Sequence, residues 1–290
     1  MNFFLKITNE IQKNFKIFKD INSISKKKPK FIFYSENKSY LKYGYLLIEY
    51  LSQRYPGEVY YISSDINDKI SALNVKNFFV GSGFFLKYFF LNVHADNFFI
   101  TTTDLNNSII IKNKFVKNYI YYFHGAISTT KAYTTGAFDN YDTILCNGDY
   151  QYIEIRKREK IENLNEKKLI KFGYSYFDYL NNKINQNNYG NEILVAPSWN
   201  KNKINFINED FEKIIDNIIK AGFVVRFRPH PETVKRSNNL ISFYKKKFKG
   251  ENFIFDDDPD NLNAMQKAKC LITDNSGISI EYIMIFKKPV

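Results

Sequence analysis

The sequence predicts an α/β fold in which two Rossmann-like domains face each other across a cleft. Short apolar runs rich in Ile, Val, Phe and Tyr alternate with segments of helical periodicity, which is the pattern of a parallel sheet with helices on both faces. A polar, Asn-rich stretch, Asn181–Asn191, divides this alternation and is typical of an interdomain linker. We therefore expect an N-terminal domain over residues 1–185 and a C-terminal domain over residues 186–290.

The first half contains seven apolar runs that we interpret as strands, because each is short and bounded by polar or turn-forming residues. They are Lys30–Ser35, Glu58–Ser63, Asn77–Val80, Phe98–Thr102, Tyr119–Phe123, Thr143–Cys146 and Leu169–Phe172. Helical periodicity predicts connecting helices at Tyr40–Gln53 and Tyr150–Glu162. This spacing suits right-handed crossovers between parallel strands.

The second half shows the same alternation more clearly. Strands are expected at Glu192–Ala196, Val224–Arg228, Asn252–Phe255 and Cys270–Thr273, and helices at Glu209–Ala221, Pro231–Phe248, Leu262–Lys269 and Ile278–Phe286. The last residues, Lys287–Val290, resemble the entry to a further strand. Because a sheet without its last strand exposes an unpaired edge, we expect the C-terminal domain to be incomplete.

The composition excludes several classes of protein. Hydrophobic residues make up 44% and charged residues 25% of the 290, which is the balance of a folded soluble chain. No apolar run reaches the roughly 18–20 residues of a membrane-spanning helix. Lys6, Glu10 and Lys13 interrupt the N-terminal apolar stretch, which argues against a secretory signal. The two cysteines, Cys146 and Cys270, argue against a disulfide scaffold or a cysteine-built zinc site and fit a reducing cytoplasm.

The formal charge of +12 indicates anionic partners: phosphorylated substrates, acidic lipid headgroups or nucleic acid. The alternative is that the excess of lysine only solvates the surface. The N-terminal segment repeats apolar residues at helical spacing, with lysines between them, at Phe4, Ile7, Ile11, Phe15 and Phe18. Such a helix could lie on an anionic membrane surface or pack on the protein itself.

Two of the three histidines follow predicted strands. His124 ends the run Tyr119–Phe123 and precedes Gly125, and His230 follows Val224–Arg228 between two prolines. Ligands of open α/β sheets bind at the carboxyl edge of the strands, so both imidazoles are candidates for proton transfer or phosphate contact. Ser128 lies in a Ser/Thr-rich segment that we expect to open the next helix. His94 precedes a strand instead, and we interpret it as structural.

A small polar turn also follows the last predicted strand. It contains Asp274, Asn275, Ser276 and Gly277 directly before a helix, so backbone N–H groups and the helix dipole could hold a phosphate or diphosphate. The alternative is ordinary helix capping by Asp274 or Ser276. The turn is neither a Walker loop nor a G-x-G-x-x-G fingerprint, so it does not indicate ATP or NAD.

Two further positions at strand ends carry polar side chains. Arg228 is placed to bind an anionic group bidentately and shares a strand face with Arg226, although both could simply solvate the strand end. Ser198 could contact a nucleotide or belong to an ordinary turn. The acidic loop Asp256–Asp258 lacks a nearby histidine, and we do not expect a metal there.

In chain order, these motifs resemble the CDP-glycerol glycerophosphotransferase family, whose members build teichoic-acid-like surface polymers. The resemblance runs from about Phe31 to Val290. It rests on Phe123-His-Gly125, Gly173, Ala196-Pro-Ser-Trp199, Arg228-Pro-His-Pro231 and Thr273-Asp-Asn-Ser-Gly277, with Ser35–Tyr40 and Gly136–Asp142 also similar. The last motif departs from the usual Asp-Tyr-Ser-Ser, and the family's chains continue past the Lys-Pro-Val point.

The resemblance implies a two-Rossmann (GT-B) fold and transfer of a polyol phosphate from a CDP-linked donor to a hydroxyl acceptor, which releases CMP. His124 would deprotonate the acceptor, with Gly125 and Ser128 on the acceptor side. His230, Arg228, Ser198 and the Asp274–Gly277 turn would hold the donor. The implied location is cytoplasmic, peripheral at the inner face of the membrane, with a polyol-phosphate or glycan acceptor that could be lipid-linked.

We expect no cofactor, no metal and no nucleic-acid partner. Two alternative functions stay open. The first is a GT-B glycosyltransferase or nucleotide-sugar epimerase, which would share the cleft and phosphate cradle but cleave at the sugar carbon. The second is a non-enzymatic binder of anions or nucleic acid, suggested by the charge, although the sequence contains no nucleic-acid recognition module.

Overall fold

The computed structural model describes residues 2–184, 190–199, 207, 210–258, 260–274 and 276–290. The chain divides into two compact units, Met1–Tyr176 and Phe177–Val290, called unit 1 and unit 2 below. Residues 185–189 of the expected linker lie outside the described residues.

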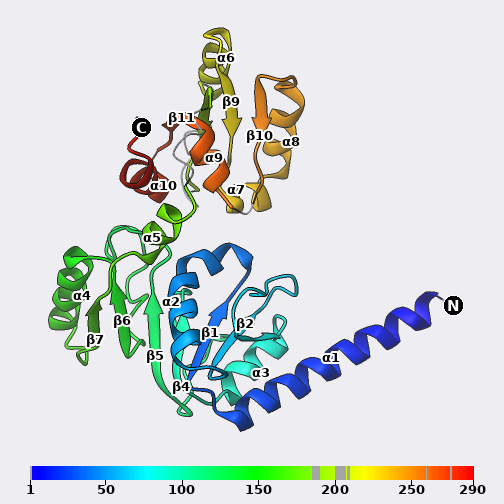
Figure 1. Ribbon diagram of the computed structural model, residues 1–290, viewed down its shortest axis with the longest axis vertical. Coiled ribbons are helices and arrows are strands. Elements are labelled where there is room, and N and C mark those ends of the chain that lie inside the picture. The colour runs from blue at the N-terminus through cyan, green and yellow to red at the C-terminus, as the bar shows by residue number, and fades with distance from the viewer. Residues whose placement is uncertain (1, 185–189, 200–206, 208–209, 259, 275) are drawn as a thin grey trace. The chain divides into compact units, whose positions relative to one another are not determined.

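Unit 1 is built on a parallel seven-stranded sheet with the order β3-β2-β1-β4-β5-β6-β7 (Figure 1). Its strands are β1 (Phe31–Ser35), β2 (Val59–Ser63), β3 (Lys76–Phe79), β4 (Ala95–Ile100), β5 (Val116–Tyr122), β6 (Thr143–Cys146) and β7 (Lys168–Lys171). All seven predicted strands are confirmed, with ends that shift by a few residues. The order reverses between β1 and β4, and this switch point is where open α/β sheets bind ligands.

Helices cover both faces of this sheet. They are α1 (Asn2–Lys27), the 3₁₀ turn η1 (Lys38–Tyr40), α2 (Leu41–Arg54), α3 (Phe84–Asn92) and α4 (Asp149–Ile161), and α5 (Ser175–Asn181) follows β7. Ile48 of α2 packs with Phe33 and Tyr61 on one face, while Phe89 of α3 packs with Tyr34 and other residues on the opposite face. The two predicted helices, α2 and α4, are confirmed within one residue at each end.

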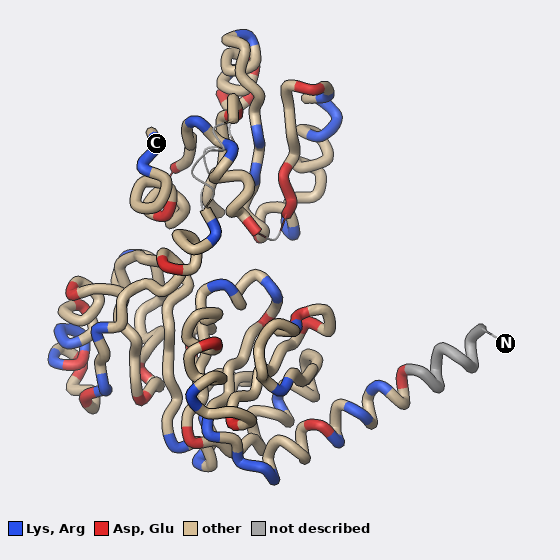
Figure 2. The backbone as a smooth tube through the Cα atoms, in the orientation of Figure 1, with Lys and Arg blue, Asp and Glu red and all other residues tan. Residues whose placement is uncertain are grey.

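The C-terminal half of the N-terminal helix α1 packs on the core of unit 1. Ile17, Ile21 and Ile24 are buried there, whereas Ile11 and Phe15 are 62% and 71% exposed. Figure 1 shows that the N-terminal turns extend away from the rest of unit 1, and Figure 2 shows basic residues along the helix. The side chains of Phe4 and Ile7 lie outside the described residues.

The segment after β5 does not form the helix expected to open at Ser128–Thr130. Residues 125–142 form turns and bends instead. The Ser128 and Thr129 side chains and the Thr129 amide all bond to Glu154 of α4, and Gly136 adopts a positive φ of 88°. These long-range bonds hold the segment in an irregular path that a continuous helix could not follow.

Unit 2 contains a parallel four-stranded sheet with the order β10-β9-β8-β11. Its strands are β8 (Glu192–Val195), β9 (Val224–Phe227), β10 (Phe253–Phe255) and β11 (Ala268–Ile272), and its helices include α6 (Phe211–Lys220), α7 (Pro231–Arg236), α8 (Asn238–Lys247), α9 (Leu262–Lys267) and α10 (Gly277–Glu281). The prediction of a single helix over Pro231–Phe248 is wrong, because the chain forms two helices there. Ser237 ends α7, and its carbonyl oxygen accepts a hydrogen bond from Ile241 N, the first such bond of α8.

The C-terminal residues lie beside the edge strand β11. A π-helical turn, η2 (Tyr282–Phe286), continues α10, and Lys287 then turns the chain in a left-handed conformation. Leu271 N donates to Pro289 O at 3.0 Å, and Lys288 Nζ donates to the carbonyls of Gln266 and Ala268 at 2.7 Å. This lysine therefore satisfies carbonyl groups at the end of α9.

Candidate functional site

In unit 1, His124 lies at the carboxyl edge of the sheet, two residues after β5 ends. Three tyrosine rings surround its imidazole: Tyr40, Tyr43 and Tyr133 have centroids 5.5, 6.1 and 6.1 Å away. The Nδ1 atom is buried and has no hydrogen-bond partner among the described residues. We therefore consider Nε2 the candidate nitrogen for a ligand contact.

Burial controls the protonation of His124. It lowers the pKa of this imidazole from 6.5 to about 4, and a hydrogen-bonding interaction with the Thr101 backbone only partly opposes the shift. No charged side chain contributes to this pKa within the described residues. At neutral pH the ring is therefore uncharged, which is the form required of a proton acceptor.

Gly125 and Ser128 belong to a loop that Asn147 and α4 hold in place. Asn147 Nδ2 donates to Gly125 O at 3.0 Å, and Ser128 Oγ donates to Glu154 Oε1 at 2.7 Å. Burial acts to raise the pKa of Glu154, but hydrogen bonds from Thr129 and Ser128 outweigh it and lower the pKa overall. The Ser128 hydroxyl thus anchors the loop beside His124, a role that the sequence did not reveal.

In unit 2, Ser198 and Asp274 meet at the carboxyl edges of β8 and β11, where the strand order reverses. Ser198 N donates to Asp274 Oδ1 at 2.7 Å, and Thr273 Oγ1 donates to Ala196 O at 2.6 Å. These two bonds tie the loop after β8 to the turn after β11. The structure therefore brings these two predicted residues together within unit 2. Asn275 lies outside the described residues.

The turn before α10 differs from ordinary side-chain capping. Ser276 occupies the N-cap position, but its side chain makes no capping bond, and its amide donates to Asp274 O at 2.8 Å. The Asp274 carboxylate is directed to Ser198 N instead. Gly277 is the first residue of α10. The first amides of a helix have no intrahelical acceptor, so a turn without a side-chain cap suits an anion.

His230 caps its own helix and thereby fixes its tautomer. Its Nδ1 atom accepts a bond from Glu232 N at 3.1 Å, so the proton of the neutral ring lies on Nε2. Partial removal from water lowers the pKa of His230, and the charge of Glu232 opposes this. The ring of Trp199 lies 6.5 Å away with an interplanar angle of 27°. The neutral side chain is thus a hydrogen-bond donor.

Arg228 lies in a network of charged side chains at the ends of β9 and β10. Its Nη1 atom donates to Asp256 Oδ1 at 3.0 Å and its Nη2 atom to Asp258 O at 2.6 Å. Arg226 forms a bidentate pair with Glu192 at 2.6 and 3.0 Å and lies 3.5 Å from Asp256 Oδ2. The Asp256 carboxylate therefore pairs with both arginines. The described residues contain no group of three or more His, Cys, Asp or Glu side chains placed to bind a metal.

The predicted site residues thus form two groups, one in each unit. His124, Gly125 and Ser128 belong to unit 1, and Ser198, Arg228, His230, Asp274, Ser276 and Gly277 belong to unit 2. Their convergence on one ligand remains a prediction. His94 stacks on Phe115 at 4.3 Å, which fits a structural histidine. Sequence reasoning missed the roles of Glu154 and Glu192, because their partners lie more than 20 residues away.

Comparison with solved structures identifies the fold. A structure of the wall teichoic acid polymerase TagF has a TM-score of 0.58 and 16% identity over 97% of this chain and 78% of that one. The UDP-GlcNAc 2-epimerase from Methanocaldococcus jannaschii has a TM-score of 0.52 and 13% identity over 90% of this chain and 82% of that one. A putative UDP-N-acetylglucosamine 2-epimerase from Listeria monocytogenes has a TM-score of 0.53 and 11% identity over 88% of this chain and 76% of that one. The predicted GT-B fold class is confirmed.

Sequence comparison adds a family. The family model described as CDP-Glycerol:Poly(glycerophosphate) glycerophosphotransferase matches residues 17–290. A search of curated proteins found no match.

Proposed function

This chain belongs to the CDP-glycerol:poly(glycerophosphate) glycerophosphotransferase family, and we propose that it transfers a polyol phosphate from a CDP-linked donor to a hydroxyl acceptor during synthesis of a surface polymer. The acceptor oxygen attacks the β-phosphorus of the donor. A new P–O bond forms, the bond between this phosphorus and the bridging oxygen breaks, and CMP leaves. The contrast between the two strand-edge histidines carries this proposal: burial keeps His124 neutral, as a base must be, and the N-cap bond of His230 leaves that ring a donor at Nε2.

His124 is our candidate for the base. Its Nε2 lone pair takes the proton of the acceptor hydroxyl if the remaining proton lies on Nδ1. A pKa of about 4 keeps the free ring neutral but makes it a weak base. The negative charge of a bound diphosphate would stabilise the imidazolium and raise this pKa toward neutrality. Donor binding would then strengthen the base at the moment when it is needed.

Unit 2 would hold the donor. His230 can donate from Nε2 to a phosphate oxygen, and the turn from Asp274 to Gly277 offers backbone amides. Arg228 would act mainly through its positive charge, because Asp256 and Asp258 already accept two of its bonds. One TagF structure is a histidine-to-asparagine variant soaked with CDPG, and this supports a CDP-linked donor for the shared fold. Catalysis would rely on positioning and on stabilisation of the departing phosphate.

A donor panel tests the reaction class. The full chain is incubated with an acceptor polymer and with CDP-glycerol, CDP-ribitol or UDP-sugars, and nucleotide release is measured. We expect CMP release from a CDP-polyol. Nucleotide release from sugar nucleotides alone would favour a glycosyltransferase, and an epimerised sugar without transfer would favour an epimerase. Salt-sensitive binding to polynucleotide without turnover would favour a non-enzymatic binder.

Histidine variants test the two roles. His124→Ala should abolish turnover and keep CDP-glycerol binding, whereas His230→Ala should weaken donor binding. His94→Asn is the matched control, because this third histidine only stacks on Phe115. Wild-type turnover in His124→Ala would remove it from the base role.

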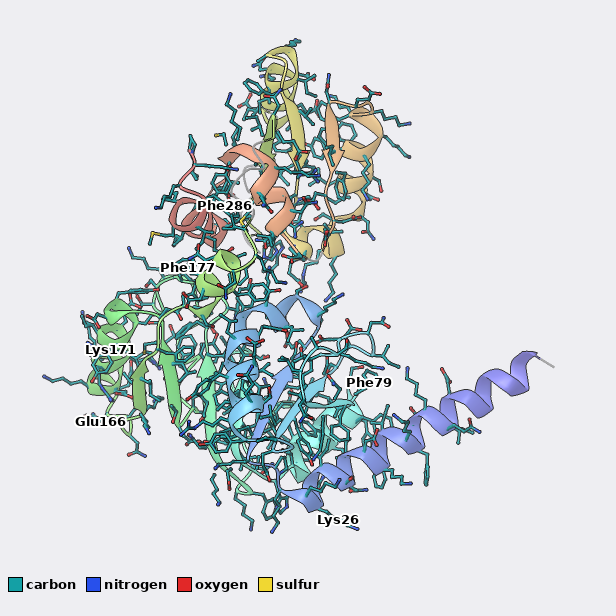
Figure 3. The ribbon with its side chains drawn as sticks, viewed as in Figure 1. Lys26, Phe79, Glu166, Lys171, Phe177 and Phe286 are labelled. Carbon is teal, nitrogen blue, oxygen red and sulfur yellow. The ribbon has the colours of Figure 1, made fainter. Side chains whose placement is uncertain are left out.

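We also propose that unit 1 binds the inner face of the membrane through α1 and α3. The described part of the chain has no helix whose length and hydropathy would let it cross a bilayer. Phe15 and Phe84 are 71% and 72% exposed, and Phe18 stacks on Tyr88 of α3 at 4.9 Å. Lys13 Nζ lies 5.2 Å from the ring of Phe79, which is labelled in Figure 3. Exposed aromatic rings beside lysines suit an anionic headgroup layer.

Co-sedimentation with vesicles tests this surface. We expect binding to phosphatidylcholine vesicles that contain phosphatidylglycerol, and loss of that binding in a Phe15→Ser/Phe84→Ser double variant. Ile153→Ser is the matched control, because Ile153 is 62% exposed on α4, away from α1. Equal binding of the double variant and the control would refute the proposed surface.

A further inference from the structure

Four buried polar atoms, of His124 and of residues connected to it, lack a protein hydrogen-bond partner. They are Thr102 Oγ1, Tyr121 OH, His124 Nδ1 and Tyr133 OH, and they make up four of the six such atoms in the described part of the chain. Leaving one buried polar group unpaired costs about 1–3 kcal/mol. Four in one place are too costly to be incidental, so their shared position calls for a functional explanation.

The four residues form one connected group. The ring of Tyr133 lies 6.1 Å from that of His124 at 83°, so the two meet edge to face. The Tyr121 and Tyr133 hydroxyls shift each other's pKa through a hydrogen-bonding interaction, so they lie close together, although neither completes a hydrogen bond of normal geometry. The ring centroids of Tyr141 and Tyr121 lie 5.1 Å apart, and the Tyr141 hydroxyl donates a hydrogen bond to Thr102 O. This bond connects Thr102 to the group. Polar atoms that are close but not bonded suit bridging by water.

We propose that these four side chains form a water-bridged relay that holds His124 in the Nδ1–H tautomer, with Tyr133 as the positioning residue. The inference rests on the proposed role of His124 as the base. A proton on Nδ1 is donated into the relay, and the Nε2 lone pair then faces the acceptor hydroxyl. When Nε2 takes the proton, the Nδ1–H bond becomes charge-assisted and strengthens.

The surroundings of the ring make a hydroxyl the suitable acceptor. The titratable side chains against His124 are Tyr40 and Tyr43 from the start of α2 and Tyr133 from the loop, with Tyr121 of β5 behind Tyr133. Burial raises the pKa of both Tyr121 and Tyr133, so their hydroxyls stay neutral and can accept one bond and donate another. A carboxylate in the same position would instead raise the pKa of His124.

The test removes one hydroxyl. Tyr133→Phe should lower kcat about tenfold with the donor KM unchanged, and should move the acid limb of kcat to lower pH, because imidazolium loses an acceptor. Tyr43→Phe is the matched control: its ring centroid is also 6.1 Å from that of His124. We expect this variant to lose less kcat than Tyr133→Phe and to leave the His124 tautomer unchanged. Nitrogen-15 NMR of histidine-labelled protein should show His124 as Nδ1–H in the wild type and a larger Nε2–H fraction in Tyr133→Phe.

The two readouts separate the relay from the reaction. An unchanged kcat, pH profile and His124 tautomer in Tyr133→Phe would overturn the relay. An equal loss in Tyr43→Phe would also overturn it, because the effect would then not be specific to the Tyr133 hydroxyl. If the wild type turns over no CDP-polyol, the proposed function fails, while the NMR tautomer still decides the relay.

Discussion

Acidification should destabilise unit 1 through His124, and the size of the effect follows from its burial. The pKa of this imidazole is about 4 in the fold, compared with 6.5 in its ordinary state. Because the folded pKa is the lower one, the unfolded chain binds the proton first. The stabilisation is therefore complete above pH 6.5 and is lost as the pH falls toward 4.

The full difference between the unfolded and the folded pKa corresponds to roughly 3 kcal/mol of unfolding free energy, because one pKa unit corresponds to about 1.36 kcal/mol. Between pH 7 and pH 5 the unfolded ring becomes almost fully protonated and the folded ring stays mostly neutral, which costs about 2 kcal/mol. Carboxylates also titrate over part of this range. The quantity to measure is therefore the difference between the wild type and His124→Asn, which keeps a polar side chain without the titration.

Hydrogen exchange of the β4 and β5 amides provides the assay, because it reports unit 1 directly. We expect the wild type to lose about 2 kcal/mol more protection than His124→Asn between pH 7 and pH 5. Trp199 is the only tryptophan and lies in unit 2, so its fluorescence follows the other unit in the same samples. Equal losses in the two proteins would refute the reasoning, because they would show that His124 is not desolvated in the fold.

Three further outcomes follow from single contacts. Gly44→Ala should destabilise unit 1 by about 1–3 kcal/mol, because a Cβ there would lie 3.0 Å from the Tyr122 hydroxyl; an unchanged melting midpoint would contradict this. Glu192→Gln should cost about 1.5–3 kcal/mol, because half-buried Arg226 loses its charged bidentate partner and keeps Asp256; a loss below about 0.5 kcal/mol in Trp199-monitored urea unfolding would count against it. Glu154→Gln should weaken the bonds from Ser128 and Thr129, and faster amide exchange over residues 125–142 would demonstrate this, whereas unchanged exchange would not fit.

The strands were predictable because a parallel strand buried on both faces must be apolar, and β6 (Thr143–Cys146) matches its prediction at both ends. Irregular segments lack such a signal. The path of residues 125–142 depends on Glu154, which lies in a helix that follows this segment. Local Ser/Thr content suggested a helix start, and the bonds to a distant carboxylate overrode it.

The site was predictable in its positions but not in its bonding. Strand ends identified His124 and His230, because ligand-binding residues collect at the carboxyl edge of parallel sheets. The partner of Arg228 depends on the register of β9 against β10. Phe255 pairs with Phe227, which brings Asp256 beside Arg228. A sequence cannot specify this register until both strands are fixed, so the same arginine could be read as a phosphate ligand or as a structural ion pair.

The tautomers of the two histidines have a consequence for the chemistry. The Nδ1 atom of His230 accepts a hydrogen bond from the amide of Glu232, so the neutral ring can only donate from Nε2. A base needs a free lone pair at the reacting atom, and we propose that Nε2 of His124 supplies it. If both histidines meet one donor, the roles cannot be exchanged without breaking the N-cap of α7. The kcat/KM profile should then fall near pH 4, the pKa of free His124, while the kcat profile falls at a higher pH because the bound diphosphate stabilises the imidazolium.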